Sequence, residues 1–535
     1  MGTRKEFIQQ SAALALGSWL LSRCTSGTGE SIPVRDADRD AAVGHRLRDM
    51  QFPAPTRDES VDVIVVGGGV AGLSAARTLT QNHCKRAVVL ELSSRLGGNA
   101  ACGAIGEMRY PLGAHYLPVV NLANSDLIEF LRESGVIQGF DAQGWPAYRE
   151  DYLVQAPDER LFMRGQWHEG LIARKHFGAE EAQQFERFMK TMDGFRELKG
   201  SDGQWMFDLP LRQCSSDQSL DALDALSMSD WMEQEGYTNA YIKWLVDYSC
   251  RDDFGAGIQE VSAWAAIHYY AARRGVGQHV DRNDVMTWPE GNGFLVERLN
   301  EQHEIPIRHL QLVYAVNKNE QGFEVLVYDV PNDCSVRWQC RAVIGALPLY
   351  LATRYAVYGD SPIGELHYAP WLVANMHFKD PQGELFDYQS HWDNVLYDSK
   401  ALGYIQSGHQ RLHAHLQEGV MTYYWALQGS DEREVRKTMR DKTLEHWSQE
   451  IMQDLEVAHP HLRRYIQSVE IKLWGHAMLK PLVGTMRGSA SKWRSTSPVL
   501  GYFPAHSDCG GLSLFEEAFD RGRQAALQTI RYLCA

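Results

Sequence analysis

The stretch VDVIVVGGGVAGLSAARTL, residues 61–79, decides the fold of this chain. It opens with a β-branched apolar run, which is typical of a strand buried on both faces of a parallel sheet. Glycines with the spacing G-x-G-x-x-G follow, and an alanine-rich segment that favours a helix comes next. A second apolar strand, AVVLE, ends in Glu91 about twenty residues further on. Strand, glycines, helix and terminal acid in this order predict a dinucleotide-binding unit of a doubly wound parallel sheet.

Each part of this unit has a physical task at a bound dinucleotide. Glycines let the backbone turn tightly and approach a pyrophosphate, and the N-terminus of the helix offers free N–H groups and partial positive charge. The acid that ends the second strand accepts hydrogen bonds from a ribose diol. The residues expected at the dinucleotide are Gly67, Gly69, Val70, Ala71, Gly72, Glu91 and Leu92.

Two motifs beyond the acid indicate which dinucleotide binds. Arg95-Leu96-Gly97-Gly98 follows it closely, and YPLGAHYLP occupies residues 110–118. With these motifs the chain resembles the flavin amine oxidase superfamily, which includes amine oxidases, protoporphyrinogen oxidases and carotenoid desaturases. The resemblance implies FAD as the cofactor. It places the pyrophosphate against Arg95, Gly97 and Gly98, and the isoalloxazine ring against Gly113, Ala114 and His115.

Later segments resemble the same superfamily in patches. LQLVYAV resembles the strand whose valine, here Val313, contacts adenine through its backbone. FPAHSDCGGLSLFEEAFDRGRQAA, residues 503–526, resembles the final flavin segment, with Asp508 at the position that meets the ribityl–phosphate region. From the residues alone, Ser513-Leu514-Phe515-Glu516 is a capping box and predicts a helix to about Tyr532. By the resemblance, the positive end of this helix faces the flavin, with Ser513 and Leu514 in contact.

Missing motifs narrow the electron path. A flavin disulfide reductase needs a redox cysteine pair after R-x-G-G, and a pyridine-nucleotide-dependent reductase needs a second glycine fingerprint; the sequence has neither. The expected cycle therefore runs from substrate to flavin and then to oxygen or a quinone. Many amine oxidases of the superfamily carry a lysine near flavin N5, whereas the matching position here falls near Leu372 or Val373. This departure keeps a desaturase or another dehydrogenase open.

The candidates for the substrate side are His115, Trp474 and His476. His115 follows the flavin-side glycine, and an imidazole can accept a proton near neutral pH; a structural histidine is the alternative. Trp474 and His476 lie in a stretch that resembles the late W…P…G segment of the superfamily. The aromatic run Tyr423-Tyr424-Trp425 is expected to pack in the core, with its first and third residues on one face of a strand. The aromatics of HYYAARRG, residues 268–275, are also expected to pack, on a helix.

Composition and the N-terminus limit the setting. The chain has 535 residues and a net charge of −15, which argues against a nucleic-acid surface. Arg4-Lys5 precedes an apolar stretch too short to span a bilayer, so residues 1–24 are typical of an export signal and resemble a twin-arginine signal. We expect a periplasmic or exported protein, with Cys24 as a candidate site for a lipid anchor; a cytoplasmic protein is the alternative. No metal site is expected, and Cys334 and Cys340 either pair or stay free.

These observations combine into one expected architecture. It is an α/β fold in which a Rossmann-like FAD-binding domain is interleaved with an α+β substrate domain. The FAD-binding domain is assigned to residues 55–120, 285–350 and 482–535, the substrate domain to 121–284 and 351–481, and a linker to 25–54. The expected function is an FAD-dependent oxidoreductase that takes a hydride from a small organic donor, in the first place a cationic amine. Its rivals are a desaturase or dehydrogenase linked to a membrane quinone, and a non-catalytic FAD-binding protein.

Overall fold

The structure, a computed structural model, describes residues 32–37, 40–154, 159–359, 365–386, 391–408, 417–488, 491 and 494–535. Residues 34–535 form one compact unit. The expected export segment 1–24, with Cys24, lies outside the described residues. Within the described ranges, no helix is both long enough and apolar enough to cross a bilayer.

A five-stranded parallel sheet forms around the glycine motif. Its order is β13 (Ile307–Arg308), β4 (Ala87–Leu90), β3 (Val63–Val66), β17 (Ala342–Gly345) and β23 (Tyr502–Pro504), and every neighbouring pair is parallel. All side chains of β3, β4 and β17 are buried, as their apolar sequences predict. Strands from both ends of the chain meet in this sheet, so the expected Rossmann-like architecture is confirmed.

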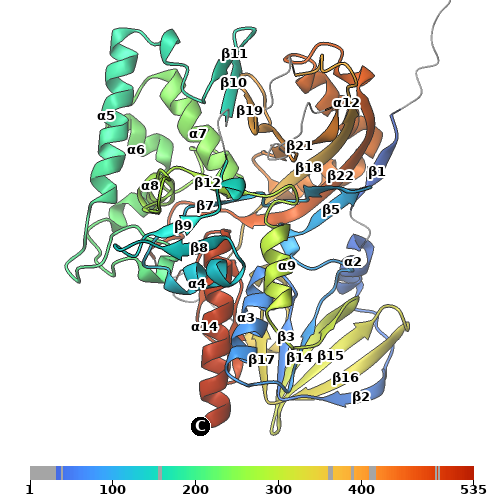
Figure 1. The fold of residues 1–535 in the computed structure, drawn as a ribbon. Coiled ribbons are helices and arrows are strands. Elements are labelled where there is room, and N and C mark those ends of the chain that lie inside the picture. The colour runs from blue at the N-terminus through green and yellow to red at the C-terminus, as the bar shows by residue number, and fades with distance from the viewer. Residues whose placement is uncertain are drawn as a thin grey trace, which may run out of the picture. The chain divides into compact units, whose positions relative to one another are not determined.

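The two faces of this sheet are covered differently. Val63 and Val65 share an apolar cluster with α3 (Val70–Gln81) and α14 (Phe515–Cys534). On the other face the cover is a second sheet, made of β14 (Gln311–Asn319), β15 (Gly322–Asp329), β16 (Cys334–Cys340) and β2 (Pro55–Ser60). In Figure 1 α14 (red) runs beside α3 (blue), and a Cβ at Gly522 would lie 1.9 Å from the Ala71 carbonyl oxygen. This close approach brings the C-terminal helix beside the glycine motif.

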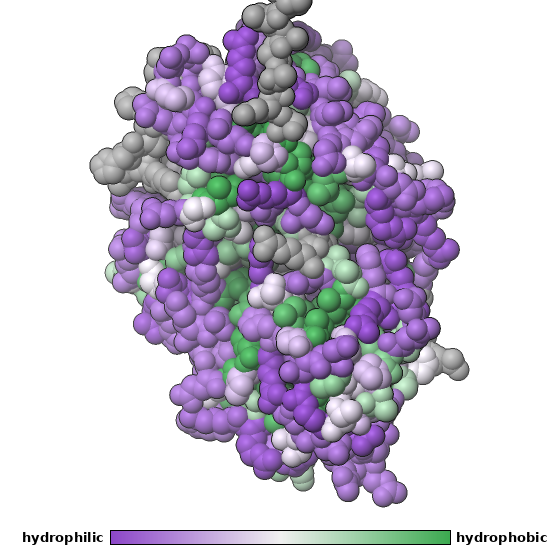
Figure 2. Space-filling view, turned by 90° about the vertical axis from the view of Figure 1, so that its right-hand side faces the viewer, coloured by the Kyte–Doolittle hydropathy of each residue, from purple (hydrophilic) through white to green (hydrophobic). Residues whose placement is uncertain are grey.

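An eight-stranded sheet forms the other large layer. Its order is β1 (Val34–Asp36), β22 (Ile466–Leu479), β18 (Tyr368–Lys379), β21 (Glu418–Ala426), β20 (Gly403–Gln406), β19 (Asp393–Leu396), β10 (Glu159–Met163) and β11 (Gln166–Glu169). The central strands β18 and β21 pair antiparallel, and every residue of β18 except Lys379 is buried. Seen from the right-hand side of Figure 1, apolar residues gather in the middle of the molecule's face, between polar upper and lower parts (Figure 2).

A helical layer packs beside this sheet. It comprises α5 (Ala179–Arg196), α6 (Met228–Gln234), α7 (Ala240–Phe254) and α8 (Ala263–Ala271), which share one large apolar cluster. Tyr241 and Tyr248 of α7 also pack against strands of the eight-stranded sheet. The remaining longer helices and the short strands are α4 (Ser125–Glu133), α9 (Gly293–Glu301), α10 (Leu349–Ala352), α11 (Glu432–Asp441), α12 (Leu444–Leu455), β5 (Cys102–Ile105), β6 (Met108–Pro111), β7 (Tyr116–Pro118), β8 (Ile137–Phe140), β9 (Pro146–Tyr148) and β12 (Val285–Thr287).

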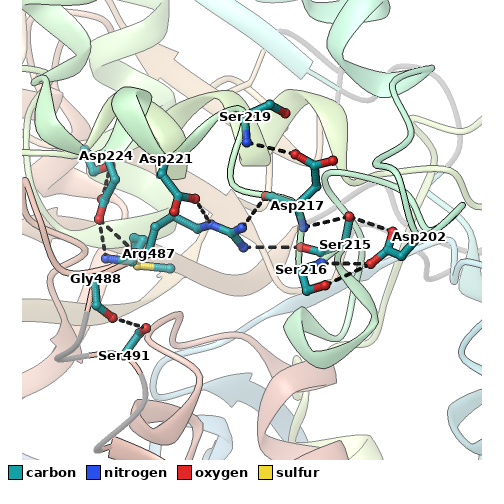
Figure 3. A network of polar contacts seen from close by, with 12 residues as sticks. Asp202, Ser215, Ser216, Asp217, Ser219, Asp221, Asp224, Arg487, Gly488 and Ser491 are labelled. Atoms are coloured by element: carbon teal, nitrogen blue, oxygen red, sulfur yellow. Dashed lines mark hydrogen bonds and ion pairs between the residues drawn. The ribbon is translucent and has the colours of Figure 1, made fainter.

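A polar network ties the helical layer to the segment that follows β22. The buried carboxylate of Asp224 accepts hydrogen bonds from the Ser262 hydroxyl at 2.6 Å and from the backbone amides of Met486 at 3.0 Å and Arg487 at 2.8 Å. The Arg487 guanidinium donates to Asp221 and to two loop carbonyl oxygens (Figure 3). The network therefore links residues that are more than 260 positions apart in the sequence.

Part of the segment expected to be a linker is folded. β1 pairs in parallel with β22, and α2 (Ala41–Asp49) follows it. The Asp40 carboxylate accepts hydrogen bonds from the Ser93 hydroxyl at 2.7 Å and the Ser94 amide at 2.9 Å. The Arg46 guanidinium lies 4.1 Å from the ring centroid of Tyr328. The described part of the expected linker therefore contacts the eight-stranded sheet through β1 and the four-stranded sheet through Arg46.

Candidate functional site

The turn from β3 into α3 is shaped by glycines with two different tasks. Gly67 has a φ of +106°, and a Cβ there would lie 2.4 Å from the Ala346 carbonyl oxygen. A Cβ at Gly72 would lie 1.8 Å from the Gly67 carbonyl oxygen. At Gly69, the N-cap of α3, an added Cβ would meet no atom closer than 3.9 Å. Gly67 and Gly72 therefore allow the turn to pack, whereas Gly69 leaves open space before the helix N-terminus.

Glu91 and the R-x-G-G segment border this space. The Glu91 carboxylate accepts hydrogen bonds from the backbone amides of Gly68 and Ser93, both at 2.6 Å. Burial raises the pKa of Glu91, and the two amides oppose that shift. Gly97 donates from its amide to the Gly68 carbonyl oxygen at 2.9 Å, and both Gly97 and Gly98 have positive φ. The glycine turn, the acid and the second glycine pair thus meet in one place.

A cavity of about 150 Å³ is lined by residues from early, middle and late segments of the chain. Its lining falls into two groups by charge. The neutral lining consists of Asn99, Gly113, Ala114, His115, Pro118, Leu209, His268, Ala272, Asn292, Trp371, Val373, Tyr424, Trp474, Ala477, Met478, Ser513, Leu514 and Phe515. The acidic lining consists of Tyr116, Asp252, Asp253, Tyr269, Arg273 and Glu516.

Backbone rather than side chains forms the centre of the neutral lining. The Asn99 carbonyl oxygen accepts a hydrogen bond from the Ala114 amide at 2.8 Å, and the Asn99 side chain donates to the Ala477 carbonyl oxygen. A Cβ at Gly113 would lie 2.3 Å from that same Asn99 oxygen. Glycine at 113 therefore allows the two segments to touch.

His115 and Tyr424 form a stacked pair in the neutral lining. Their ring centroids are 4.5 Å apart with planes inclined by 26°, and the Tyr424 hydroxyl donates to the Gly113 carbonyl oxygen at 3.1 Å. Burial lowers the pKa of His115 to about 3, so its ring is neutral at pH 7. The expectation that His115 accepts a proton near neutral pH is therefore not supported, because a desolvated imidazole is a weak base.

The acidic lining centres on the last turn of α7. The Tyr116 hydroxyl lies 3.3 Å from the Asp252 carboxylate and 3.5 Å from that of Asp253. Arg273, just beyond α8, lies 3.5 Å from Asp253 and stacks over Tyr269 at 4.5 Å. Burial, with the Asp253 charge next in importance, raises the pKa of Asp252 to about 7. Two carboxyl groups thus share one guanidinium and one phenol in surroundings that disfavour charge.

Helix α14 begins one residue later than the capping-box pattern predicts. Its N-cap is Leu514, and the Ser513 hydroxyl accepts a hydrogen bond from the Leu479 amide at 3.1 Å instead of capping the helix. The expected helix is confirmed, but the expected capping box is wrong, because a neighbouring strand takes up its serine. Glu516, which the box would have turned back toward the backbone, lines the cavity and is 6% exposed.

Several predicted site residues meet at the cavity. These are Gly113, Ala114, His115, Trp474, Ser513 and Leu514. The Trp474 indole donates to the Leu112 carbonyl oxygen at 2.7 Å, which fixes its ring beside the backbone of the neutral lining. The predicted assembly of early, middle and late segments therefore occurs in the structure, while the roles of these residues stay predictions.

Other predicted residues do not line the cavity. His476 stacks on Tyr350 with ring centroids 4.3 Å apart, and burial lowers its pKa to about 4. The buried Asp508 accepts a hydrogen bond from the Leu349 amide at 2.9 Å, so a backbone group occupies it. The Val313 carbonyl oxygen accepts a hydrogen bond from a tyrosine hydroxyl at 3.2 Å. These three positions lie apart from the lining, and their predicted contacts stay predictions.

Sequence reasoning missed most of the acidic lining and one aromatic residue. Tyr424 lines the cavity, whereas Tyr423, on the opposite face of β21, packs in the core. Tyr269 packs against the apolar cluster of the helical layer, as expected, and also lines the cavity. The available signal was the adjacent pair Asp252-Asp253 in the last turn of a helix most of whose residues are buried.

The lysine expected from the superfamily is absent from the lining. Val373 faces the cavity at the position that the sequence comparison indicated, and the described lining residues include no lysine. Lys472 pairs with Val373 across β18 and β22, and its Nζ lies 4.3 Å from the ring centroid of Trp474. The Lys472 ammonium thus lies over the Trp474 ring and does not line the cavity.

Metal and disulfide sites find no support in the described ranges. No group of three or more His, Cys, Asp or Glu residues there is arranged to hold a metal ion. Cys334 and Cys340, at the two ends of β16, are both free thiols.

The residues present fit FAD. Open space before Gly69 and the free amides of the first turn of α3 suit a diphosphate. The Glu91 oxygens retain lone pairs for a ribose diol. The backbone at residues 113–114 lines the cavity with Trp474 and offers a surface for a ring, and the N-terminus of α14 offers positive potential. FAD would then be held by Gly69, Glu91, Gly113, Ala114 and Ser513.

Comparisons with known proteins point the same way. Residues 65–133 match the family model of the NAD(P)-binding Rossmann-like domain. Protein anon-37Cs of Drosophila simulans is 34% identical over 111 residues, which make up 21% of this chain and 21% of that protein. Among solved structures, wild-type putrescine oxidase bound to putrescine has a TM-score of 0.63 at 17% identity and covers 89% of this chain and 100% of its own. Cyclohexylamine oxidase from Brevibacterium oxydans has a TM-score of 0.60 at 15% identity, again with 89% and 100% coverage.

These matches differ in what they establish. The match to the Drosophila protein spans only about a fifth of that protein's length. The likeness to the two oxidases extends over nearly the whole chain and establishes the fold. The expected fold, with its Rossmann-like dinucleotide-binding domain, is confirmed. In fold the chain is similar to these two oxidases, and its residues 65–133 are similar to NAD(P)-binding Rossmann-like domains.

Proposed function

We propose that this protein is an FAD-dependent amine oxidase that removes two electrons from a small amine and passes them to oxygen. The observation that carries the proposal is the composition of the cavity, in which a neutral, aromatic lining adjoins an acidic one. FAD, when bound, supplies the acceptor for a hydride equivalent. The two oxidases of the same fold are named for amine substrates, which supports the same substrate class here.

The neutral lining favours the reactive form of an amine. An alkylamine is an ammonium ion in water at neutral pH, and a hydride can leave its carbon only when the nitrogen lone pair is free. The neutral lining holds no charged side chain, and the pKa of His115 is lowered to about 3 by burial. Transfer of an ammonium ion into such surroundings is costly, so the amine loses its proton to water as it enters.

The backbone that faces the substrate is held in place by hydrogen bonds. The Thr287 hydroxyl donates to the His115 carbonyl oxygen at 2.7 Å, and the Asn292 side chain donates to the Tyr116 carbonyl oxygen at 3.0 Å. The Asn292 amide donates to the Ala114 carbonyl oxygen at 3.1 Å. A fixed surface orients a small donor, and Trp371, Tyr424 and Trp474 exclude water from it.

The proposed reaction balances with oxygen as oxidant. One primary amine, one oxygen molecule and one water give one aldehyde, one ammonia and one hydrogen peroxide. The amine loses two electrons and two protons as its carbon–nitrogen bond becomes an imine. Oxygen takes up both electrons and both protons and becomes hydrogen peroxide. Water then replaces the nitrogen of the imine, and the nitrogen leaves as ammonia.

Product analysis tests this proposal against its rivals. FAD-loaded protein is incubated in air with a panel of primary amines, and aldehyde, ammonia and hydrogen peroxide are measured. We expect the three products in equal amounts. If amines react only when a quinone is added, the protein is a dehydrogenase and not an oxidase. The lack of a lysine in the described cavity lining would agree with that result. Absence of any product, with the flavin bound, would support the non-catalytic reading.

A further inference from the structure

The acidic lining contains a row of three carboxyl groups. It starts with Glu516 at the N-terminus of α14 and continues through Asp253 and Asp252 on α7. All three side chains line the same cavity, and the Tyr116 hydroxyl lies 3.3 Å from the Asp252 carboxylate and 3.5 Å from that of Asp253. Asp393 on β19 and Glu159 on β10 pair across neighbouring strands and lie outside this lining. Three acids from two different elements thus face one cavity.

Positive charge in this row is scarce. Arg273 is the only cationic side chain in the described lining of the cavity, and it is 3.5 Å from Asp253. Arg251, the neighbour of Asp252 on α7, points to Asp247, with which it pairs at 2.9 Å. The described lining therefore holds three carboxyl groups and one guanidinium group.

Glu516 is an independent sign that a ligand completes the row. Its side chain lines the cavity and is 6% exposed. Burial raises its pKa to about 7, and a hydrogen bond from its own backbone opposes that shift. A negative charge is costly on so buried a carboxyl group, and a ligand that carries N–H groups and positive charge would lower that cost.

The remaining lining specifies an organic cation. The described residues include no group of acids arranged to hold a metal ion. The faces of Tyr116, Tyr269, Trp371 and Tyr424 surround the same cavity, and aromatic faces attract ammonium groups. A carboxylate-bearing substrate such as an amino acid would meet one guanidinium but three carboxyl groups.

We propose that the row selects a substrate with at least two ammonium groups, an α,ω-diamine or a longer polyamine, and that Asp252 and Asp253 bind the ammonium that does not react. This inference rests on the proposed function and specifies its substrate class. The reacting nitrogen lies in the neutral lining as the free amine, while the second nitrogen keeps its proton among the acids.

The test compares putrescine with butylamine, which has the same carbon chain and one amine fewer. FAD-loaded wild-type protein is mixed anaerobically with each, and the flavin spectrum gives an apparent Kd and a limiting rate of reduction. We expect putrescine to bind at least about 10-fold more tightly than butylamine. The Asp252→Asn and Asp253→Asn variants are expected to lose most of that ratio through Kd, with smaller changes in limiting rate.

Matched controls and contrary results separate the two proposals. Asp398→Asn removes the same charge at an exposed position outside the cavity and should keep the ratio. Asp252→Glu restores the charge and should restore part of the preference. Equal Kd values for the two amines in the wild type would overturn this inference and leave amine oxidation standing. A spectral shift with putrescine but no reduction would keep the binding site and reject the oxidase, whereas no response to either amine would reject both.

Discussion

The dinucleotide cradle and the acidic lining are built in opposite ways. The cradle consists of backbone, in which Gly67 and Gly72 allow the turn to pack and Gly69 leaves open space where a ligand would lie. The acidic lining consists of side chains, and Tyr116 and Asp252 in it are 136 residues apart. A backbone site needs only the absence of side chains over a short stretch, whereas a side-chain site needs several distant segments to be in register. The cradle is therefore easy to recognise in the sequence and easy to disrupt with one substitution. The acidic lining is the part that we propose selects the substrate.

The largest effect is expected from a substitution that breaks the cradle. In Gly72→Ala the new Cβ would lie 1.8 Å from the Gly67 carbonyl oxygen, a backbone atom that cannot move aside. We expect a loss of more than about 3 kcal/mol in the free energy of unfolding, with loss of bound flavin. Denaturant unfolding and the flavin content of the purified protein check this. Gly194→Ala, in the exposed interior of α5 where an added Cβ meets no atom within 4 Å, is the control and should keep or slightly raise the stability.

The second effect concerns the helical layer that carries the acids. Asp224→Ala would leave the Ser262 hydroxyl and the amides of Met486 and Arg487 without their buried acceptor. We expect a loss of about 2–4 kcal/mol in the free energy of unfolding, while the variant that remains folded still binds FAD. Chemical denaturation and flavin absorbance are the measurements. A stability equal to that of wild type would show that the network in Figure 3 is not a structural link.

The third effect separates ligand binding from folding within the cradle. Gly69→Ala places a methyl group in open space, since the nearest atom would lie 3.9 Å away. The apoprotein should therefore keep its Tm, while the affinity for FAD falls by about 10-fold or more because the methyl group occupies the approach to the diphosphate. Titration of the apoprotein with FAD, followed by flavin fluorescence, gives the Kd. An unchanged Kd would mean that FAD does not lie in front of this residue.

The smallest effect is the pH dependence that Asp252 confers. Burial and Asp253 raise its pKa to about 7, while Arg273, Tyr116 and Arg251 oppose the shift. Between the unfolded pKa near 3.8 and the folded pKa, only the folded state keeps the proton, so stability falls as pH rises through this window. The apoprotein of Asp252→Asn should therefore gain stability relative to wild type between pH 4 and pH 7, by about 1 kcal/mol or more. Thermal unfolding at several pH values measures it, and a constant difference would reject the raised pKa.

The sequence predicts the cradle because its signals are local. β3, the glycines, α3 and Glu91 follow one another within about thirty residues, and each has one preferred conformation. The segment around Gly113 and the C-terminal helix are also found, because each resembles a known motif over a continuous stretch. The whole flavin side of the cavity is thus predictable except in its finer contacts.

The finer contacts fail where tertiary partners compete with local patterns. Ser513 has the sequence of a helix cap, but the Leu479 amide takes its hydroxyl. Trp474 and His476 are two residues apart on β22, yet only Trp474 lines the cavity, since His476 lies against Tyr350. The pattern of a strand gives the face of a side chain but not the point along the strand at which a cavity ends.

The acidic lining could not be predicted for the same reason on a larger scale. The pair Asp252-Asp253 is visible in the sequence, but its partners come from β7, from the end of α8 and from α14. Neither spacing nor composition indicates that these elements meet. Only the packing of the helical layer against the flavin side brings the carboxyl groups into one cavity.

The most direct test of the central claim is the absorbance spectrum of the purified protein before and after anaerobic addition of a primary amine. The account predicts a yellow protein with a flavin spectrum that is bleached by at least one amine. A yellow protein that no amine bleaches would retain the cradle and contradict the amine oxidase. A colourless protein that also fails to take up added FAD would contradict the account at its base.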